Sequence, residues 1–455
     1  MTRPVRRPPS MEALLGNEAV RALAVRFGRT RTKAALRRAC DLLRRGALPD
    51  EAALVDSAAR ELGLRGPAGP RRVVNATGVL LHTNLGRAPL AEAALQAVRE
   101  AAGYCTLEYE PESGRRGRRG DHVVPLVLEL FAPDREDLDA ALTTNTAAAL
   151  LLAFDTVANG RPVAVSRGEL VAIGGDFRVP SILARSGATL AEVGTTNKTT
   201  REDYEAALDA GAAAILKVHP SNYRIVGFTQ EVGLAELGEV ARHAGVPLVF
   251  DAGSGAPRRF AEPGLADQPV PLEALEAGAD LVCFSGDKTL GGPQTGILLG
   301  LSPLIARANA NPLARALRPD KLVLAALAAT LELHLSGREG EVPFHRMLRL
   351  TLESLDARAA RVVSAALEQG YGADVIASIA VAGGGSGTES TLPSRAVALR
   401  HPACSADALA ARLRALDVPI VGRVSEDRLV LDLRTVAPEE DALLVAALKE
   451  LTSPT

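Results

Sequence analysis

The sequence predicts an α/β protein whose main domain contains a mostly parallel sheet covered by helices on both faces. Between about residues 73 and 300, short apolar runs alternate with segments of helical periodicity, and this alternation is typical of such a sheet. The expected strands are 140–142, 162–165, 213–218, 247–250 and 281–284. A mixed or partly antiparallel sheet is compatible with the same pattern. In either case we expect ligands at the carboxyl ends of the strands.

Composition and cysteine spacing favour a soluble globular protein without disulfide bonds. Of the 455 residues, 47% are hydrophobic and 23% are charged, as in ordinary soluble globular proteins. The sequence contains no apolar run of membrane-spanning length and no signal-peptide pattern, so we expect a cytoplasmic protein that does not enter a membrane. The four cysteines, Cys40, Cys105, Cys283 and Cys404, are far apart, which argues against a disulfide framework and a metal site.

The N-terminal region is basic and predicted to be helical. Residues 11–64 carry apolar side chains at helical spacing, with Ser10 as the cap of the first helix. Residues 1–72 contain 16 Lys and Arg but 7 Asp and Glu, a net charge of +9 within a chain whose total is −2. A basic helical surface suits an anionic partner such as RNA. A solvated, arginine-rich helix face is the alternative.

We divide the chain into three domains. A segment rich in Gly and Pro separates the helical region 1–66 from the α/β region 67–335. Residues 336–455 follow a long helical stretch and contain further helices with a pair of strands, 418–423 and 428–433, joined by a short polar turn. This pattern predicts a smaller α+β domain at the C-terminal end.

Lys288 lies in a glycine-rich segment directly after the expected strand 281–284. Small neighbours let a flat ring approach the backbone, and the hydroxyl of Ser285 can hold a phosphate, so the segment suits covalent binding of pyridoxal phosphate. A solvated loop lysine is the alternative. Asp251 ends another strand, where its carboxylate would keep the pyridine nitrogen of the cofactor protonated, although a turn aspartate would look the same.

Further candidates follow other strands. Thr144, Asn145 and Thr146 open a helix, whose free N–H groups form a cradle for a phosphate, while ordinary helix capping explains these residues almost as well. Asn222 suits a bond to the 3′-oxygen of the cofactor, or a turn. His219 is a candidate for stacking on the cofactor ring.

Two arginines and an aromatic residue complete the candidates from the residues themselves. Arg315 and Arg318 are three residues apart, so they share a helix face and together suit a phosphate-like anion. A surface pair with nearby acidic residues is the alternative. Phe177 is a second candidate for stacking on the cofactor ring.

Long motifs occur in order from the helical N-terminus to near residue 440. They are Asn75–Gly78, His82–Arg87, Ser166–Leu170, Ile173–Gly175, Gly194–Asn197, Ser285–Lys288, Gly291–Gln294, Arg315–Lys321 and Leu431–Val436. Together they resemble the bacterial L-seryl-tRNA(Sec) selenium transferase (selenocysteine synthase) family. The resemblance implies a fold-type-I, aspartate aminotransferase-like transferase dependent on pyridoxal phosphate, with a helical N-terminal domain and a smaller α+β C-terminal domain. It also implies a homodecamer built as a ring of dimers.

The resemblance further implies a reaction and roles for residues. The family converts L-seryl-tRNA(Sec) to L-selenocysteinyl-tRNA(Sec) with selenophosphate, through a dehydroalanyl-tRNA intermediate, and its N-terminal domain grips the tRNA. By matching motifs, Lys288 bonds covalently to the cofactor, Asp251 faces the pyridinium nitrogen and Ser285 holds phosphate. Arg87, Arg315 and Arg318 match positions that hold the anionic group of the selenium donor.

The sequence departs from the family pattern at several positions. Thr144 and Thr146 replace members of a run of asparagines, Ala172 replaces a glutamate, and Thr289 and Ala252 replace leucines. An alternative function keeps the fold and cofactor but not the tRNA, as an ammonia-lyase or eliminase acting on a small amino acid or amino sugar. We expect such an enzyme to lack a full basic helical domain. A tRNA-binding protein without catalysis would not need the lysine and the strand-end aspartate.

Overall fold

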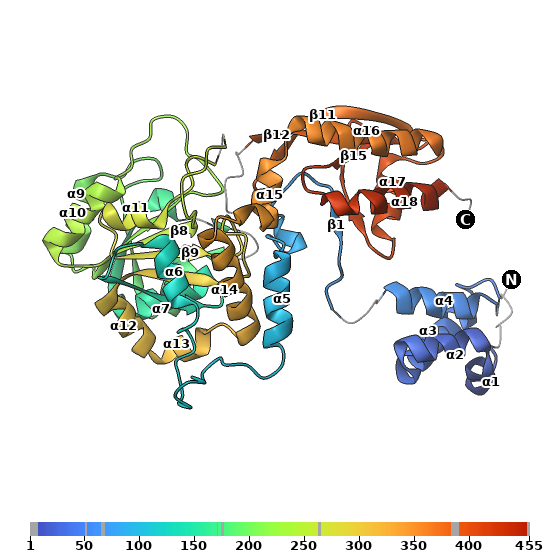
Figure 1. Cartoon of the computed structure of the whole chain (residues 1–455), viewed down its shortest axis with the longest axis horizontal. Coiled ribbons are helices and arrows are strands. Elements are labelled where there is room, and N and C mark those ends of the chain that lie inside the picture. Colours follow the sequence, from blue (N-terminus) through green and yellow to red (C-terminus); the bar gives the residue numbers. More distant parts are fainter. Residues whose placement is uncertain are drawn as a thin grey trace. The chain divides into compact units, whose positions relative to one another are not determined.

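The computed structural model describes residues 8–50, 52–64, 69–170, 172–173, 177–262, 265–383 and 391–452. The chain divides into two compact units (Figure 1). The first contains the N-terminal residues up to Val73, grouped with the segment Asp417–Pro419, and the second contains the rest. No helix in these described ranges is long and apolar enough to cross a membrane.

The N-terminal unit is helical. Its described helices are α1 (Met11–Gly16), α2 (Glu18–Phe27), α3 (Arg29–Arg44) and α4 (Ala52–Leu64). The hydroxyl of Ser10 accepts a hydrogen bond from the N–H of Ala13 at 3.1 Å, which confirms this residue as the cap of α1. Leu36 and Leu43 of α3 belong to the apolar core of the unit. The exposed basic residues of this helix and the residue after it are Arg29, Arg31, Arg37, Arg38, Arg44 and Arg45.

A seven-stranded sheet forms the centre of the second unit. Its strands lie in the order β2 (Leu138–Thr143), β10 (Gly296–Leu301), β9 (Leu281–Ser285), β8 (Leu248–Ser254), β7 (Ala214–Val218), β3 (Pro162–Ser166) and β6 (Thr189–Val193). Strand β10 is antiparallel to both neighbours, whereas the five strands from β9 to β6 are mutually parallel. The five expected strands are confirmed, and the sheet is mixed.

Helices cover both faces of this sheet because successive side chains of a strand point to opposite sides. In β9, Val282 and Phe284 pack with α6 (Val124–Phe131), α10 (Leu234–Ala244) and α14 (Lys321–Leu335). Its alternate residues, Leu281 and Cys283, pack in a second core with α7 (Thr146–Ala158), α8 (Val179–Arg185) and α12 (Ser302–Ala310). The result is a three-layer arrangement (Figure 1).

Shorter elements connect these layers. They are α5 (Glu92–Ala101), β4 (Ala172–Ile173), β5 (Phe177–Arg178), α9 (Arg201–Asp209), α11 (Pro271–Glu276), α13 (Pro312–Leu317) and α15 (Pro343–Arg349). Strands β4 and β5 pair with each other in the antiparallel sense. Helix α5 packs against α14.

A four-stranded antiparallel sheet lies in the C-terminal part of the chain. Its order is β11 (Gly372–Val381), β12 (Thr391–Arg400), β15 (Arg428–Asp432) and β14 (Arg423–Ser425). Helices α16 (Leu352–Glu368), α17 (Ala406–Arg414) and α18 (Asp441–Thr452) accompany it. In Figure 1, α16 lies along β11 and β12.

The expected pairing of 418–423 with 428–433 is wrong in its first half. Only β14 pairs with β15, and β13 (Ile420–Val421) instead pairs in parallel with β1 (Val74–Asn75). Glu426 and Asp427 both have positive φ, 51° and 55°, which makes the tight two-residue turn that sets the register of β14 against β15. The chain leaves this hairpin before Arg423 and forms a separate parallel pair.

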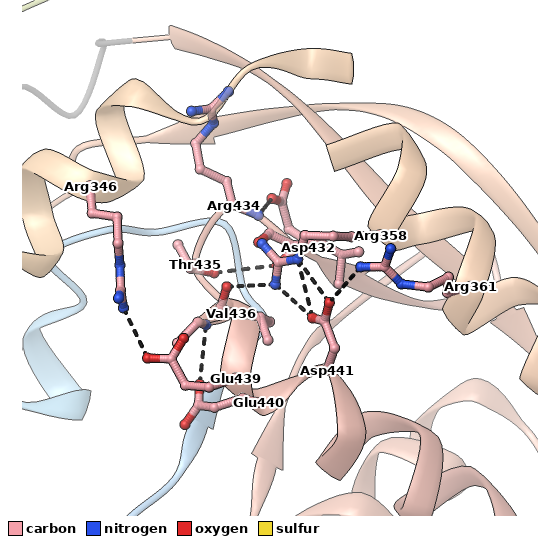
Figure 2. A network of polar contacts seen from close by, with 12 residues as sticks. Arg346, Arg358, Arg361, Asp432, Arg434, Thr435, Val436, Glu439, Glu440 and Asp441 are labelled. Atoms are coloured by element: carbon pink, nitrogen blue, oxygen red, sulfur yellow. Dashed lines mark hydrogen bonds and ion pairs between the residues drawn. The ribbon is translucent and has the colours of Figure 1, made fainter. Parts of the chain in front are cut away.

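Polar contacts anchor the C-terminal motif Leu431–Val436. Arg358 of α16 contacts Asp441 at 2.6 Å and donates to the carbonyls of residues 433 and 436 (Figure 2). Buried Asp432 accepts hydrogen bonds from the hydroxyls of Ser378 and Ser394 at 2.5 and 2.7 Å. Such a satisfied buried network specifies one arrangement of the elements that contribute to it.

The same motif holds the segment Asn75–Gly78. The N–H of Asp432 donates to the carbonyl of Ala76 at 2.9 Å, and the hydroxyl of Thr435 accepts from the N–H of Gly78 at 3.1 Å. Gly78 has a φ of 82°, and a Cβ there would lie 2.9 Å from the carboxylate of Asp432. Glycine is therefore required at this crossing, and these two motifs serve as structural partners of each other.

Candidate active site

The carboxyl ends of β7, β8 and β9 meet at one edge of the central sheet, where the polar candidates lie. Asp251 lies in β8, Ser285 ends β9, and His219 directly follows β7. The N–H of His219 donates to the carbonyl of Asp251 at 2.9 Å. Burial lowers the pKa of His219 to about 4, so its ring is neutral. A neutral, partly buried ring on a residue whose backbone contacts that of Asp251 is compatible with stacking on a cofactor.

Lys288 lies in a tight turn after β9. The N–H of Gly286 donates to the carbonyl of Thr295, and the N–H of Gly291 donates to the carbonyl of Lys288, both at 2.9 Å. The lysine is only 6% exposed. A Cβ on Gly253 would lie 3.7 Å from Lys288 Nζ and 3.6 Å from Ser221 Oγ. The lysine nitrogen therefore reaches back to the end of β8.

Burial sets the charge balance of the lysine and the aspartate. It lowers the pKa of Lys288 to about 8, against an opposing effect of the Asp251 charge. It also raises the pKa of Asp251, against the effect of the Lys288 charge and of a 2.9 Å hydrogen bond from the N–H of Gly253. The two groups are thus neighbours in a poorly solvated site. A lysine with this pKa is partly neutral near neutral pH, as a nucleophile or base must be.

The phosphate candidates divide into two roles. Thr146 at the start of α7 and Ser285 at the end of β9 place their hydroxyls 2.5 Å apart. Asn145 caps α7, because its Oδ1 accepts from the N–H of Ala148 at 2.9 Å. The N–H of Thr144 donates to the carbonyl of Leu317 at 2.9 Å, and its side chain is exposed. The structure therefore brings Thr146 and Ser285 together at a helix N-terminus that suits an anion.

Buried polar atoms without partners test whether a cofactor fits. Within the described ranges, Ser221 Oγ, Asn222 Oδ1, His82 Nδ1 and Asp287 Oδ1 are buried and have no hydrogen-bond partner. Leaving such atoms unsatisfied costs about 1–3 kcal/mol each. Ser221 lies beside the lysine nitrogen, and Asn222 is the next residue. These donors and acceptors fit a polar ligand such as pyridoxal phosphate.

Arg87 is paired with the residue that precedes the lysine. Its Nη1 lies 2.9 Å from Oδ2 of Asp287, and the two side chains are 27% and 9% exposed. Arg87 has a φ of 63°, a left-handed conformation that costs a non-glycine residue about 1–2 kcal/mol. Such strain is typical of functional sites. Asp287 was not among the predicted site residues, although a carboxylate next to the lysine is a signal for such a role.

Arg315 lies in α13, but Arg318 follows the helix in an extended conformation, so the prediction that the two share a helix face is wrong. They contribute to a cavity of about 340 Å³ together with Arg118 and Arg119, and its walls include neither Arg87 nor Lys288. Glu108 contacts the Arg116 and Arg119 side chains at 2.8 and 3.0 Å and Arg318 at 3.7 Å. Arg118 and Arg119, in the Arg- and Gly-rich loop 114–120, therefore join the two predicted arginines around this cavity, and neither was among the predicted site residues.

Two departures from the family pattern have different outcomes. The hydroxyl of Thr289 lies 2.7 Å from Ser254 Oγ, which also accepts from the N–H of Thr289. Both hydroxyls are buried, so this threonine is paired with a serine of β8. Ala172 lies in β4, and nothing in the structure explains its replacement of glutamate. The side chain of Phe177, and the glycines of Ile173–Gly175, lie outside the described residues.

Comparison with known proteins decides between the alternatives. Residues 73–437 match the family model described as L-seryl-tRNA selenium transferase, and residues 6–44 match the N-terminal region of selenocysteine synthase. The chain belongs to the L-seryl-tRNA selenium transferase family. Membership of this family favours the selenium transferase over the ammonia-lyase alternative, and it makes pyridoxal phosphate the cofactor.

The relatives cover most of the chain. An L-seryl-tRNA(Sec) selenium transferase from Solidesulfovibrio magneticus is 46% identical over 84% of this chain and 83% of its own length. One from Methylocella silvestris is 44% identical over 95% and 94%. The solved structure of D-glucosaminate-6-phosphate ammonia-lyase superposes with a TM-score of 0.60 at 23% identity, over 86% of this chain and 98% of that one. The fold is that of the fold-type-I transferases dependent on pyridoxal phosphate.

Proposed function

We propose that the protein converts L-seryl-tRNA(Sec) to L-selenocysteinyl-tRNA(Sec), with selenophosphate as the selenium donor. The observation that carries the proposal is buried Lys288 beside Asp251 at the carboxyl edge of the sheet, in a chain that matches the selenium transferase family over most of its length. The edge provides a lysine, a carboxylate and a hydroxyl pair for one cofactor. The transferase reaction requires all three kinds of group.

Each group at the edge has a proposed role. Lys288 would hold the cofactor covalently, Asp251 would keep its ring nitrogen protonated, and Thr146 with Ser285 would hold its phosphate. Bound pyridoxal phosphate supplies a sink for the electrons left when the α-carbon of the seryl group loses a proton. Once the α-amine of the seryl group has displaced it from the cofactor, Lys288 Nζ, with its pKa lowered to about 8, would accept that proton and pass it to the departing serine hydroxyl. The serine hydroxyl then leaves as water, which gives dehydroalanyl-tRNA.

Arginines would bind the selenium donor in two places. Arg315 and Arg318 line the 340 Å³ cavity with Arg118 and Arg119, and guanidinium groups suit the oxygens of a phosphate. Arg87 lies beside Asp287, next to the lysine. We infer that the cavity takes up selenophosphate and that Arg87 receives it beside the dehydroalanyl group, where its selenium would bond to the β-carbon and water would break the P–Se bond to release phosphate.

The remaining assignments concern partners and domains. The basic surface of α3 in region 1–66 would grip the tRNA, because RNA of this kind is bound through shape and backbone phosphates. Regions 67–335 and 336–455 would form the cofactor domain and the small domain. Family membership supports a homodecamer. A substrate drawn from the pool of aminoacylated tRNA places the reaction in the cytoplasm.

The test is conversion of purified seryl-tRNA(Sec) in the presence of selenophosphate and pyridoxal phosphate. Lys288→Ala and the charge-conserving Lys288→Arg are expected to lose both conversion and the visible absorbance of bound cofactor. Lys449→Ala, at an exposed position of α18, is the matched control and should retain both. Conversion by Lys288→Ala at the rate of this control would refute the proposal.

A further inference from the structure

Two histidines hold the backbone that directly follows Lys288. His345 Nε2 lies 3.0 Å from the carbonyl oxygen of Thr289, and His334 Nε2 lies 2.9 Å from that of Leu290. His345 lies in α15 and His334 in α14. Their rings meet edge to face, with centroids 4.9 Å apart. Two side chains from different helices therefore fix two consecutive carbonyls of the lysine turn.

The carbonyl acceptors define which nitrogen of each imidazole ring carries the proton. A carbonyl oxygen only accepts hydrogen bonds, so each Nε2 carries the proton and donates. Burial lowers the pKa of both rings, that of His345 to about 3, so both are neutral. The charged groups facing the pair are Arg258, Arg349 and Glu339. The two contacts are thus neutral hydrogen bonds that do not change over the working pH range.

The helix that carries His345 is itself anchored by the C-terminal motif. Arg434 Nη1 donates to the carbonyl of Met347 at 2.7 Å, near the end of α15, and its Nη2 donates to the carbonyl of Pro393 at 2.5 Å. The N–H of Arg434 in turn donates to the Asp432 carboxylate at 3.1 Å (Figure 2). Arg434 thus ties the C-terminal sheet to α15, and the His345 side chain ties the same helix to the carbonyl of Thr289.

The opposite side of the lysine turn is held by the central sheet. Ser254 of β8 contacts both the N–H and the hydroxyl of Thr289. Thr289 therefore lies between the strand that carries Asp251 and the helix that carries His345. Its position limits where the Cα of Lys288, the preceding residue, can lie, because consecutive Cα atoms are only about 3.8 Å apart.

We propose that His345 and His334 are positioning residues for Lys288, and that Arg434 acts through α15 to hold His345 in place. This inference rests on the proposed function, in which Lys288 binds the cofactor. The C-terminal region thereby contributes to the lysine turn through α15. A turn that is fixed from both sides keeps Lys288 Nζ close to the end of β8.

The first experiment measures amide hydrogen exchange of residues 286–292 in cofactor-free protein. His345→Leu removes the donor and is expected to speed exchange of the turn on the order of tenfold. His345→Gln keeps an N–H donor of similar reach and should restore slow exchange. His243→Leu, at an exposed position of α10, is the control and should leave exchange unchanged. Arg434→Leu should speed exchange both in α15 and in the turn.

The second experiment follows the loaded enzyme. His345→Leu should lower kcat by at least about tenfold while the KM for seryl-tRNA changes little, and should shift the pH midpoint of the cofactor absorbance. His345→Gln should recover most of kcat. Unchanged exchange and an unchanged midpoint in His345→Leu would overturn the positioning role. If Lys288→Ala kept the cofactor absorbance, the proposed function itself would fail. If Lys288→Ala lost the absorbance but His345→Leu behaved like the unsubstituted protein, only the positioning role would fail.

Discussion

Removing the Lys288 amine is expected to stabilise the cofactor-free protein. Burial lowers the pKa of Lys288 from its ordinary 10.5 to about 8, and the residue is only 6% exposed. One pKa unit corresponds to about 1.4 kcal/mol. Below pH 8 the lysine is protonated in both states, so its buried charge costs the folded state about 3 kcal/mol. Lys288→Met, which replaces the amine with an uncharged, unbranched side chain one atom shorter, should recover about this amount at pH 7.

The pH dependence has a definite sign. Between about pH 8 and 10.5 the unfolded chain binds a proton at Lys288 and the folded protein does not, so the free energy of unfolding rises with pH across this window. Lys288→Met lacks this contribution. Its advantage over the unsubstituted protein should therefore be fully present at pH 7 and should vanish as the pH rises through 10.5.

Urea unfolding of protein freed of its cofactor measures both effects. Curves at pH 7, 9 and 10 for the unsubstituted chain and Lys288→Met give the free energy of unfolding and its slope. Lys449→Met, exposed on α18, controls for the loss of a surface charge and should change stability by less than about 0.5 kcal/mol. The reasoning would be refuted if Lys288→Met were less stable at pH 7, or if its difference from the unsubstituted chain did not shrink as the pH rises.

Three further predictions concern other parts of the molecule. Asp251→Asn keeps the acceptor for the Gly253 N–H but removes the charge that raises the pKa of Lys288. In a steady-state assay, the rate of conversion should therefore fall by about 100-fold or more. A smaller loss would contradict the role of Asp251 at the pyridinium nitrogen. Glu169→Gln removes the carboxylate that lies 2.7 Å from Nζ of buried Lys217. It should lower the free energy of unfolding, measured in urea, by about 3 kcal/mol. An effect no larger than that of a surface substitution would argue against a stabilising Glu169–Lys217 ion pair. Arg315→Gln should raise the KM for selenophosphate about tenfold with little change in kcat, and an unchanged KM would exclude the cavity as the donor site.

Most of the secondary structure could be predicted because it depends on local pattern. Helix α10 is an example, because it lies between two glycines, Gly233 and Gly245, the second with a positive φ. Strand β10 was not foreseen. Its six residues include two glycines and follow a glycine-rich turn, so neither propensity nor periodicity marks it. It is a strand because β2 and β9 both pair with it.

In the candidate site, too, some residues could be predicted from local sequence and others only from the tertiary structure. Lys288 and Asp251 could be found from their places at strand ends, because parallel strands bring such residues to one edge. The pairing of Arg87 with Asp287 joins residues two hundred positions apart, and no local pattern reveals it. His334 and His345 looked like ordinary helical residues for the same reason, since the carbonyls they contact lie on a distant turn.

The sequence by itself determined the fold class, the family, and which residues have the chemistry for a cofactor site. It left the role of each polar residue open, because capping, turn formation and ligand binding use the same side chains. Only the tertiary structure assigned Asn145 to the cap of α7 and brought Thr146 to Ser285. The physical reason is that hydrogen bonds act over about 3 Å, so the partner of a side chain is decided by which distant elements pack beside it.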